Sequence, residues 1–386
     1  MNVRIALVLG SVVLVAASPS GEAQSQARNA QRPNVVLIIT DDVGYGDLGS
    51  YGAPDIKTPH IDGLARDGVR LTDFYANGAT CTPTRAGLIS GRYQQRFGLE
   101  DPLGAGGPAD LERGLSPTGR SLPQLLKGNG YATALVGKWH LGWKAEFSPG
   151  AHGFDHFFGF KNGFTDFYHR TDGDGRADLF ENDRPVEVPG YMTDLITERS
   201  VQFIEQNARR PFFIDVAYNA AHWPYQVPDK PSKARNNARH VVWEGGIRVP
   251  AILRWPGHIP AGRVSGQVGI TMDLTASILA ATHTPVPVDA HLEGIDLFPV
   301  LEGRAPAIER TLFWRVVAAR PQRAVRSGDW KLIFDGPRPL LFNLRTDIGE
   351  RNDVIGAHSD IARRLRTLLA AWQADVDVEA RRATPR

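Results

Sequence analysis

The chain has a single cysteine in 386 residues, Cys81, within the stretch TCTPTRAGLISGRY (80–93). The residues at 82–84, Thr-Pro-Thr, predict the start of a helix, because proline is favoured in a first turn. Cys81 would then lie at a helix N-terminus, where free N–H groups and the helix dipole favour an anion. Arg85, about one turn on, would add a permanent positive charge. The stretch predicts an anion site with a reactive thiol at its mouth, and an inert buried thiol is the alternative.

Ionisable residues also stand at the ends of three predicted strands. The runs NVVLIIT (34–40), YATALVGKWHLG (131–142) and PFFIDVAYNAAHWP (211–224) are typical of strands buried in a parallel sheet. In such sheets, ligands bind beyond the carboxyl ends of the strands. The side chains at these ends therefore predict a site, and they are Asp41 and Asp42, Lys138 and His140, and His222.

Helical patterns alternate with these strands. TPHIDGLARDG (58–68), SLPQLLKGNG (121–130) and TDLITERSVQFIEQN (193–207) carry helix start or stop signals or helical spacing of apolar residues. Alternating strands and helices favour an α/β domain with a mostly parallel sheet flanked by helices. We expect this catalytic domain to span 33–304.

The character of the sequence changes after Arg304. The segments RTLFWRVV (310–317), RAVRSGDWKLIF (323–334) and RPLLFNL (338–344) predict short strands separated by turns, which form a small antiparallel sheet. A final helix follows, with an apolar stripe made of Ile361, Leu365, Leu368 and Trp372. We expect a smaller subdomain over 305–386.

The N-terminus and the charge limit where the protein works and what it binds. Residues 1–23 have a short positive start, an apolar run and small residues up to Ala23, which predicts a secretory signal peptide. No later run approaches the roughly 20 apolar residues that a membrane span needs. The net charge is +2 without blocks of like charge, so nothing indicates nucleic acid. We expect an exported protein, periplasmic or secreted.

Several motifs together resemble one enzyme family. CTPTRAGLISGR (81–92) resembles the signature of the type I sulfatases, in which Cys-x-Pro-x-Arg marks a cysteine for oxidation to formylglycine. It is joined, in the family's order, by PNVVLIITDDVGYGDLGSYG (33–52), GKWHLG (137–142), AYNAAHWP (217–224) and WEGGIRVPAILRWPG (243–257). The resemblance is nearest to arylsulfatases and glycan sulfatases. It implies the alkaline-phosphatase-like α/β sandwich and the hydrolysis of a sulfated sugar or aryl sulfate.

The resemblance also implies a cofactor and a maturation partner. Cys81 would be converted to formylglycine by a formylglycine-generating enzyme, and its hydrate would attack sulfur. Asp41 and Asp42 match the family's first ligands of a calcium ion, with magnesium as the other candidate. The modified Cys81 would complete this part of the metal site. Adjacent carboxylates at a strand end suit a hard cation bound by oxygens.

The remaining site residues match family positions that touch the reacting groups. Arg85 and Lys138 match residues that hold the formylglycine and the sulfate oxygens, where positive charge stabilises developing negative charge. His140 matches the residue near the formylglycine hydroxyl, which implies a base for eliminating sulfate. His222 matches a sulfate contact, which implies an acid for the leaving oxygen.

The chain departs from the family between His222 and Trp243. Family members carry a much longer segment there, with a strand that gives calcium two more ligands and a loop lysine that binds sulfate. The polar connection here, near 229–242, has no buried-strand pattern. We therefore expect a missing segment, a gapped or closed-up sheet, a weaker metal site and reduced stability.

Four functions remain open from the sequence. The first is a formylglycine-dependent sulfuric ester hydrolase. The second is a phosphate or phosphonate ester hydrolase of the same superfamily, because both substrates present a tetrahedral oxyanion. The third is a catalytically impaired relative that binds sulfated glycans, and the fourth is a poorly folded remnant without function.

Overall fold

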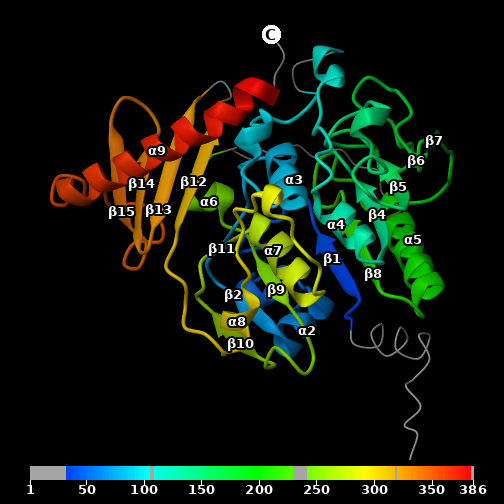
Figure 1. The fold of residues 1–386 in the computed structure, drawn as a ribbon, viewed down its shortest axis with the longest axis horizontal. Helices are drawn as coiled ribbons and strands as arrows, with labels where there is room; N and C mark the ends of the chain where they lie inside the picture. Colours follow the sequence, from blue (N-terminus) through cyan, green and yellow to red (C-terminus); the bar gives the residue numbers. More distant parts are fainter. Residues whose placement is uncertain (1–31, 105–107, 229–240, 318–319, 384–386) are drawn as a thin grey trace, which may run out of the picture.

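The computed structural model describes residues 32–104, 108–228, 241–317 and 320–383 (Figure 1). The predicted signal peptide at 1–23 lies outside these ranges, as does most of the connection near 229–242. None of the described helices is long and apolar enough to cross a membrane.

A six-stranded sheet carries the predicted strand ends. Its order is β1 (Val35–Ile39), β8 (Phe212–Ala217), β4 (Ala132–Lys138), β5 (His156–Phe160), β6 (Phe180–Glu181) and β7 (Arg184–Pro185). The first four strands are parallel, whereas β6 and β7 pair antiparallel. Ile39 lies beside Ala217, which lies beside Gly137, so the carboxyl ends of β1, β8 and β4 meet at one edge.

Helices cover both faces of this sheet, as the alternating pattern predicts. One face carries α3 (Cys81–Ser90), α4 (Leu122–Gly128) and α7 (Thr271–Ala281), whose apolar side chains meet Leu135 and Phe213 of the sheet. The other face carries α5 (Met192–Asn207), which packs against Ile214 and Val216 (Figure 1). The predicted helix start at Ser121 is correct, because Ser121 and Gln124 form a capping box.

β1 is the edge of the six-stranded sheet, and β8 is its one strand neighbour in the described chain. The side chains of Val36 and Ile38 are 47% and 52% exposed, although their register partners Ile214 and Val216 are buried. A parallel strand in the middle of an α/β sheet is normally covered on both faces. A half-exposed strand at this edge is what a gap in the sheet would produce, and the missing segment itself stays a prediction.

The remaining strands of the first 304 residues form two separate small sheets. One has the order β10 (Arg263–Ser265), β2 (Val69–Leu71), β9 (Ala251–Leu253), and the other pairs β11 (Gly269–Ile270) with β3 (Phe74–Tyr75). Three further helices are α2 (Pro59–Asp67), α6 (Glu244–Ile247) and α8 (Phe298–Leu301). In the described chain the main sheet thus ends at β1.

The predicted C-terminal sheet and helix are confirmed. Antiparallel strands β12 (Thr311–Val316), β13 (Gln322–Ser327), β14 (Trp330–Phe334) and β15 (Pro339–Asn343) follow one another in order, and α9 (Ser359–Ala383) lies across them (Figure 1). The stripe of α9 in the core consists of Leu365, Leu369, Trp372 and Val376, with Ile361 and Leu368 at its border. The subdomain boundary after residue 304 stays a prediction.

The half-exposed apolar side chains of Val36 and Ile38 on the edge strand β1 predict an aggregation-prone surface. Ile38→Lys should suppress aggregation during heating, because a charge on a strand edge blocks pairing with another chain. The free energy of unfolding should change by less than about 1 kcal/mol, since the side chain is half exposed. Light scattering and denaturant unfolding measure the two quantities.

Val288→Lys is the matched control for this variant. It gives the same change in net charge at a side chain that is 93% exposed but lies in a short 3-10 helix rather than in a strand. Equal protection by both variants would show that net charge, rather than the β1 edge, governs aggregation.

Candidate active site

α3 begins at Cys81, one residue before the predicted start, and places the thiol at the edge where the strands end. Thr80 precedes it in an extended conformation and makes no side-chain cap, and Pro83 lies in the first turn. Cys81 is a free, partly buried thiol. The first N–H groups of α3 therefore lack the side-chain acceptor that usually satisfies them, which suits an anion there.

Thr82 fastens the first turn of α3 to the chain that follows β4. Its buried hydroxyl donates to the carbonyl of His140 at 3.0 Å and accepts from the amide of Leu103 at 3.1 Å. Two hydrogen bonds at one fully buried residue fix the position of Cys81 relative to His140.

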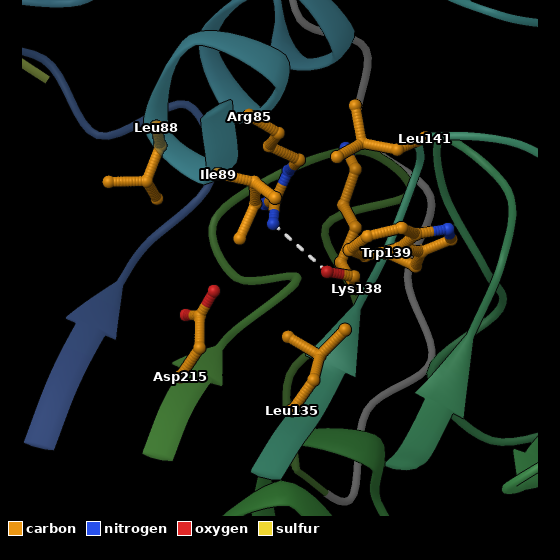
Figure 2. Close-up of a pocket in the computed structure, with 8 residues that line it drawn as sticks. All are labelled: Arg85, Leu88, Ile89, Leu135, Lys138, Trp139, Leu141 and Asp215. Carbon is orange, nitrogen blue, oxygen red and sulfur yellow. Dashed lines mark hydrogen bonds between the residues drawn. The ribbon is translucent and has the colours of Figure 1, made fainter. Parts of the chain in front are cut away.

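A buried cluster of three charges joins β1, β4 and α3. Lys138 Nζ lies 2.5 Å from Asp41 Oδ2, and Arg85 Nη2 lies 3.9 Å from Asp41 Oδ1. Arg85 Nη1 also donates to the carbonyl of Lys138 at 3.0 Å (Figure 2). Burial alone would raise the pKa of Asp41, but the charges of Lys138 and Arg85 outweigh burial and lower that pKa. The cluster carries one net positive charge, which suits an anionic ligand.

His140 lies next to this cluster with one ring nitrogen free. Its Nε2 is 2.8 Å from the carbonyl of Leu103, so Nε2 carries the proton and Nδ1 keeps a lone pair. Nδ1 is buried and has no hydrogen-bond partner among the described residues. Burial and the charge of Lys138 lower the pKa of His140 to about 3, so the ring is neutral near pH 7. The free lone pair of Nδ1 can accept a hydrogen bond or a proton, and the lowered pKa makes the ring a weak base in this arrangement of charges.

Asp42 and His222 lie together at the open side of the site. His222 Nε2 is 3.8 Å from Asp42 Oδ2, and His222 Nδ1 lies 2.8 Å from the carbonyl of Trp223. The ring of Phe164 stacks on His222 with centroids 6.4 Å apart. Asp42 and His140 have φ values of 60° and 55°, an uncommon backbone conformation that is often found at functional sites.

The sequence did not single out Asp215, which lies behind Arg85. It is 3% exposed, and its Oδ1 has no hydrogen-bond partner among the described residues. Burial raises the pKa of Asp215 to about 7, and the charge of Arg85 lowers it in part. The signal was present in FFIDVA (212–217), where one carboxylate interrupts a buried apolar strand.

Comparisons with known proteins agree with this geometry. A family model described as Sulfatase matches residues 33–241. The N-acetylgalactosamine-6-sulfatase of Sus scrofa is 32% identical over 362 aligned positions, which cover 74% of this chain and 68% of the relative. The chain belongs to the sulfatase family. Arylsulfatase A of Bos taurus is 29% identical over 444 positions, covering 86% of this sulfatase and 85% of the relative.

Solved structures support the fold of the sulfatase. The crystal structure of Ps i-CgsB has a TM-score of 0.82 and 25% identity, and the match covers 89% of this chain and 93% of that one. The structure of BT4656, in complex with its substrate D-glucosamine-2-N,6-O-disulfate, has a TM-score of 0.74 and 19% identity, with 90% and 98% coverage. The predicted alkaline-phosphatase-like fold is confirmed.

The alignment with arylsulfatase A also measures how much shorter this sulfatase is. Of 386 residues, 86% is about 332, yet the alignment has 444 positions, so about 112 positions of the relative face no residue here. We propose that part of this difference in length lies near 229–242, where the sequence predicts a missing segment.

The divalent cation that the family implies does not fit the side chains as they lie here. Lys138 forms an ion pair with Oδ2 of Asp41, and the guanidinium of Arg85 lies near Oδ1. Nowhere in the described chain do three or more His, Cys, Asp or Glu side chains group closely enough to hold a metal. Calcium requires six to eight oxygens. The predicted ligands Asp41, Asp42 and Cys81 therefore do not form a metal site by themselves.

Because the described side chains do not form a metal site, we expect a Kd for calcium well above about 5 mM. A ligand stabilises a protein appreciably only when its concentration exceeds its Kd. Calcium at about 5 mM should therefore change the melting temperature of the chelator-treated sulfatase by less than about 1 °C. Magnesium is the comparison cation. A rise of several degrees that Asp42→Asn abolishes would contradict this expectation.

Replacement of Asp215 should stabilise the fold most at high pH. A carboxyl whose pKa is raised in the folded state binds its proton more tightly there, so the wild type loses stability as pH rises from about 4 to 7. Asp215→Leu removes this loss. Its gain in the free energy of unfolding over the wild type should be roughly 2 kcal/mol larger at pH 8 than at pH 5. Urea unfolding at both pH values tests this, and an equal gain at both would contradict it.

Proposed function

We propose that this sulfatase releases inorganic sulfate from a sulfated sugar, and from aryl sulfates as small substrates, with a nucleophile derived from Cys81. One observation carries the proposal. The only cysteine begins α3, at the edge where β1 and β4 deliver Asp41 and Lys138, and Arg85 follows one turn later beside both.

The charge cluster supports binding of the sulfate group. Arg85 and Lys138 carry two positive charges against the single negative charge of Asp41, and the uncapped first turn of α3 adds N–H donors. A preorganised set of donors and cations stabilises the charge that develops on sulfate oxygens during hydrolysis. In this proposal the ammonium group of Lys138 donates hydrogen bonds to both Asp41 and a sulfate oxygen of the substrate.

The two histidines are placed for opposite proton transfers. The Cys81 side chain would be oxidised to an aldehyde by the formylglycine-generating enzyme. A hydroxyl of the hydrated aldehyde would then be the oxygen nucleophile. His140 Nδ1 is free and unprotonated, which supports its role as the base. His222 donates from Nδ1 to the carbonyl of Trp223, which leaves Nε2 on the side of Asp42, and we assign to Nε2 the transfer of a proton to the leaving oxygen.

A sugar substrate is supported by the names and ligands of similar proteins. The relatives include N-acetylgalactosamine-6-sulfatases, and Ps i-CgsB has been solved in complex with k-i-k-neocarrahexaose. The phosphate or phosphonate ester alternative needs the same oxyanion contacts, so relative rates on matched sulfate and phosphate esters distinguish the two. Export, with removal of residues 1–23, and maturation by a formylglycine-generating enzyme complete the proposal.

A divalent cation, calcium or magnesium, is implied by the family resemblance alone. No step above depends on it, because the described side chains of Asp41 and Asp42 do not hold a metal as they lie.

The test is hydrolysis of an aryl sulfate by the secreted protein, co-expressed with a formylglycine-generating enzyme. Intact mass on the same sample reports both oxidation of Cys81 and cleavage after Ala23. Cys81→Ala should lower turnover by at least about a thousandfold, since it removes the nucleophile. The variant must melt like the wild type for the comparison to hold.

Each failure has a separate meaning. Oxidised, folded protein without turnover that still binds a sulfated oligosaccharide would favour the catalytically impaired relative, which the roughly 112 unmatched positions of arylsulfatase A motivate. Faster turnover of the phosphate ester would favour the phosphoesterase.

A further inference from the structure

Asp215 carries a buried carboxylate whose neighbours on both adjacent strands are leucines. In the sheet it lies between Leu37 of β1 and Leu135 of β4. Its side chain faces α3, and Figure 2 shows the carboxylate pointing toward the helix from which Arg85 descends. A strand neighbour of this kind would ordinarily be apolar, because an unpaired buried carboxylate is costly.

A small cavity separates Asp215 from Arg85. It has a volume of about 10 Å³, which is room for about one water molecule. Its other walls are side chains of α3 and β4 and of the residues after β4: Leu88, Ile89, Leu135, Lys138, Trp139 and Leu141. Asp215 Oδ1 has no partner among the described residues, so the cavity borders a buried carboxylate that is not satisfied.

Two charged groups approach Asp215 from the elements packed on it. Arg85 comes from α3, and Lys138 comes from β4 but extends its ammonium to Asp41. β1 presents only Leu37 at this level. Arg85 is therefore the charge that an ionised Asp215 would attract.

The guanidinium of Arg85 lines the same cavity as Asp215 but makes its contacts elsewhere in this structure. It donates to the carbonyl of Lys138 and lies 3.9 Å from Asp41, on the side where the substrate is proposed to bind. The guanidinium is thus placed between two carboxylates, one at the site and one behind it. Its position depends on how strongly each attracts it.

We propose that Asp215 is a positioning residue that controls Arg85: neutral Asp215 leaves the guanidinium at the sulfate site, and ionised Asp215 draws it back across the cavity. The change needs no covalent step, only loss of one proton to solvent. Burial raises the pKa of Asp215 to about 7, so both forms exist near neutral pH. The inference rests on the proposed function, because it assigns Arg85 to the sulfate group.

The first experiment is the pH profile of kcat/KM for an aryl sulfate from about pH 5.5 to 9. The wild type should lose activity above about pH 7, up to about tenfold per pH unit, mainly through a higher KM. Asp215→Asn keeps the shape and stays neutral, so this alkaline fall should disappear. Asp215→Leu should behave alike and replaces it if the Asn variant does not fold.

Asp178→Asn is the matched control. Asp178 is also buried, and burial raises its pKa to about 6, but it accepts from the amides of Lys161 and Asn162 rather than facing Arg85. This variant should retain the alkaline fall of the wild type. The same fall in Asp215→Asn and Asp215→Leu as in the wild type would overturn the proposal.

A second readout does not need turnover. Calorimetric titration with inorganic sulfate should give a Kd at least about tenfold higher at pH 8.5 than at pH 6 in the wild type, and an unchanged Kd in Asp215→Asn. If the oxidised protein turns over no substrate, the proposed function fails while this titration still decides the role of Asp215. A Kd with equal pH dependence in both proteins, or no sulfate binding at either pH, overturns the proposal.

Discussion

This site depends on the ion pairs that the buried carboxylate of Asp41 makes with Lys138 and Arg85. Asp41 lies two residues after β1, and it pairs with Lys138 from β4 and Arg85 from α3, so three segments distant in sequence meet at one charge. A buried ion pair stabilises little by itself, but loss of one partner leaves an uncompensated charge and is strongly destabilising. The arrangement therefore holds both cations in place for an anionic ligand while making the fold around them intolerant of change.

The ion pair between Lys138 and Asp41 also affects whether a metal ion can bind to Asp41. In a sulfatase with all family ligands, a cation would compete with Lys138 for Asp41. Here β1 is an edge strand of the described sheet, and no three His, Cys, Asp or Glu side chains of the described chain group closely enough to hold a metal. Lys138 supplies a positive charge near the place where the metal is implied. The ion pair of Lys138 with Asp41 therefore compensates the carboxylate charge and, at the same time, takes up an oxygen that a cation would use.

Much of this could be predicted from residue types, and the reasons for the rest are physical. Strand ends, the start of α3 within one residue and the C-terminal sheet follow from local patterns. The contacts of Thr82 with Leu103 and His140 do not, because they depend on how distant loops meet. Asp215 was visible as an exception in an apolar strand, but only the register of β8 with β1 and β4, under α3, shows that Arg85 faces it.

The last long helix has a consequence for how the molecule is made. Arg96, just beyond α3, pairs with Asp375 and Glu379 of α9, and Trp372 of α9 stacks edge-on against Tyr93. The short helix that carries Arg96 follows the active-site helix almost directly. Until the ribosome has added the residues of α9, this region lacks its outer support. A nascent chain would thus lack the ion pairs of Arg96 and the aromatic contact of Tyr93 until its last residues are made.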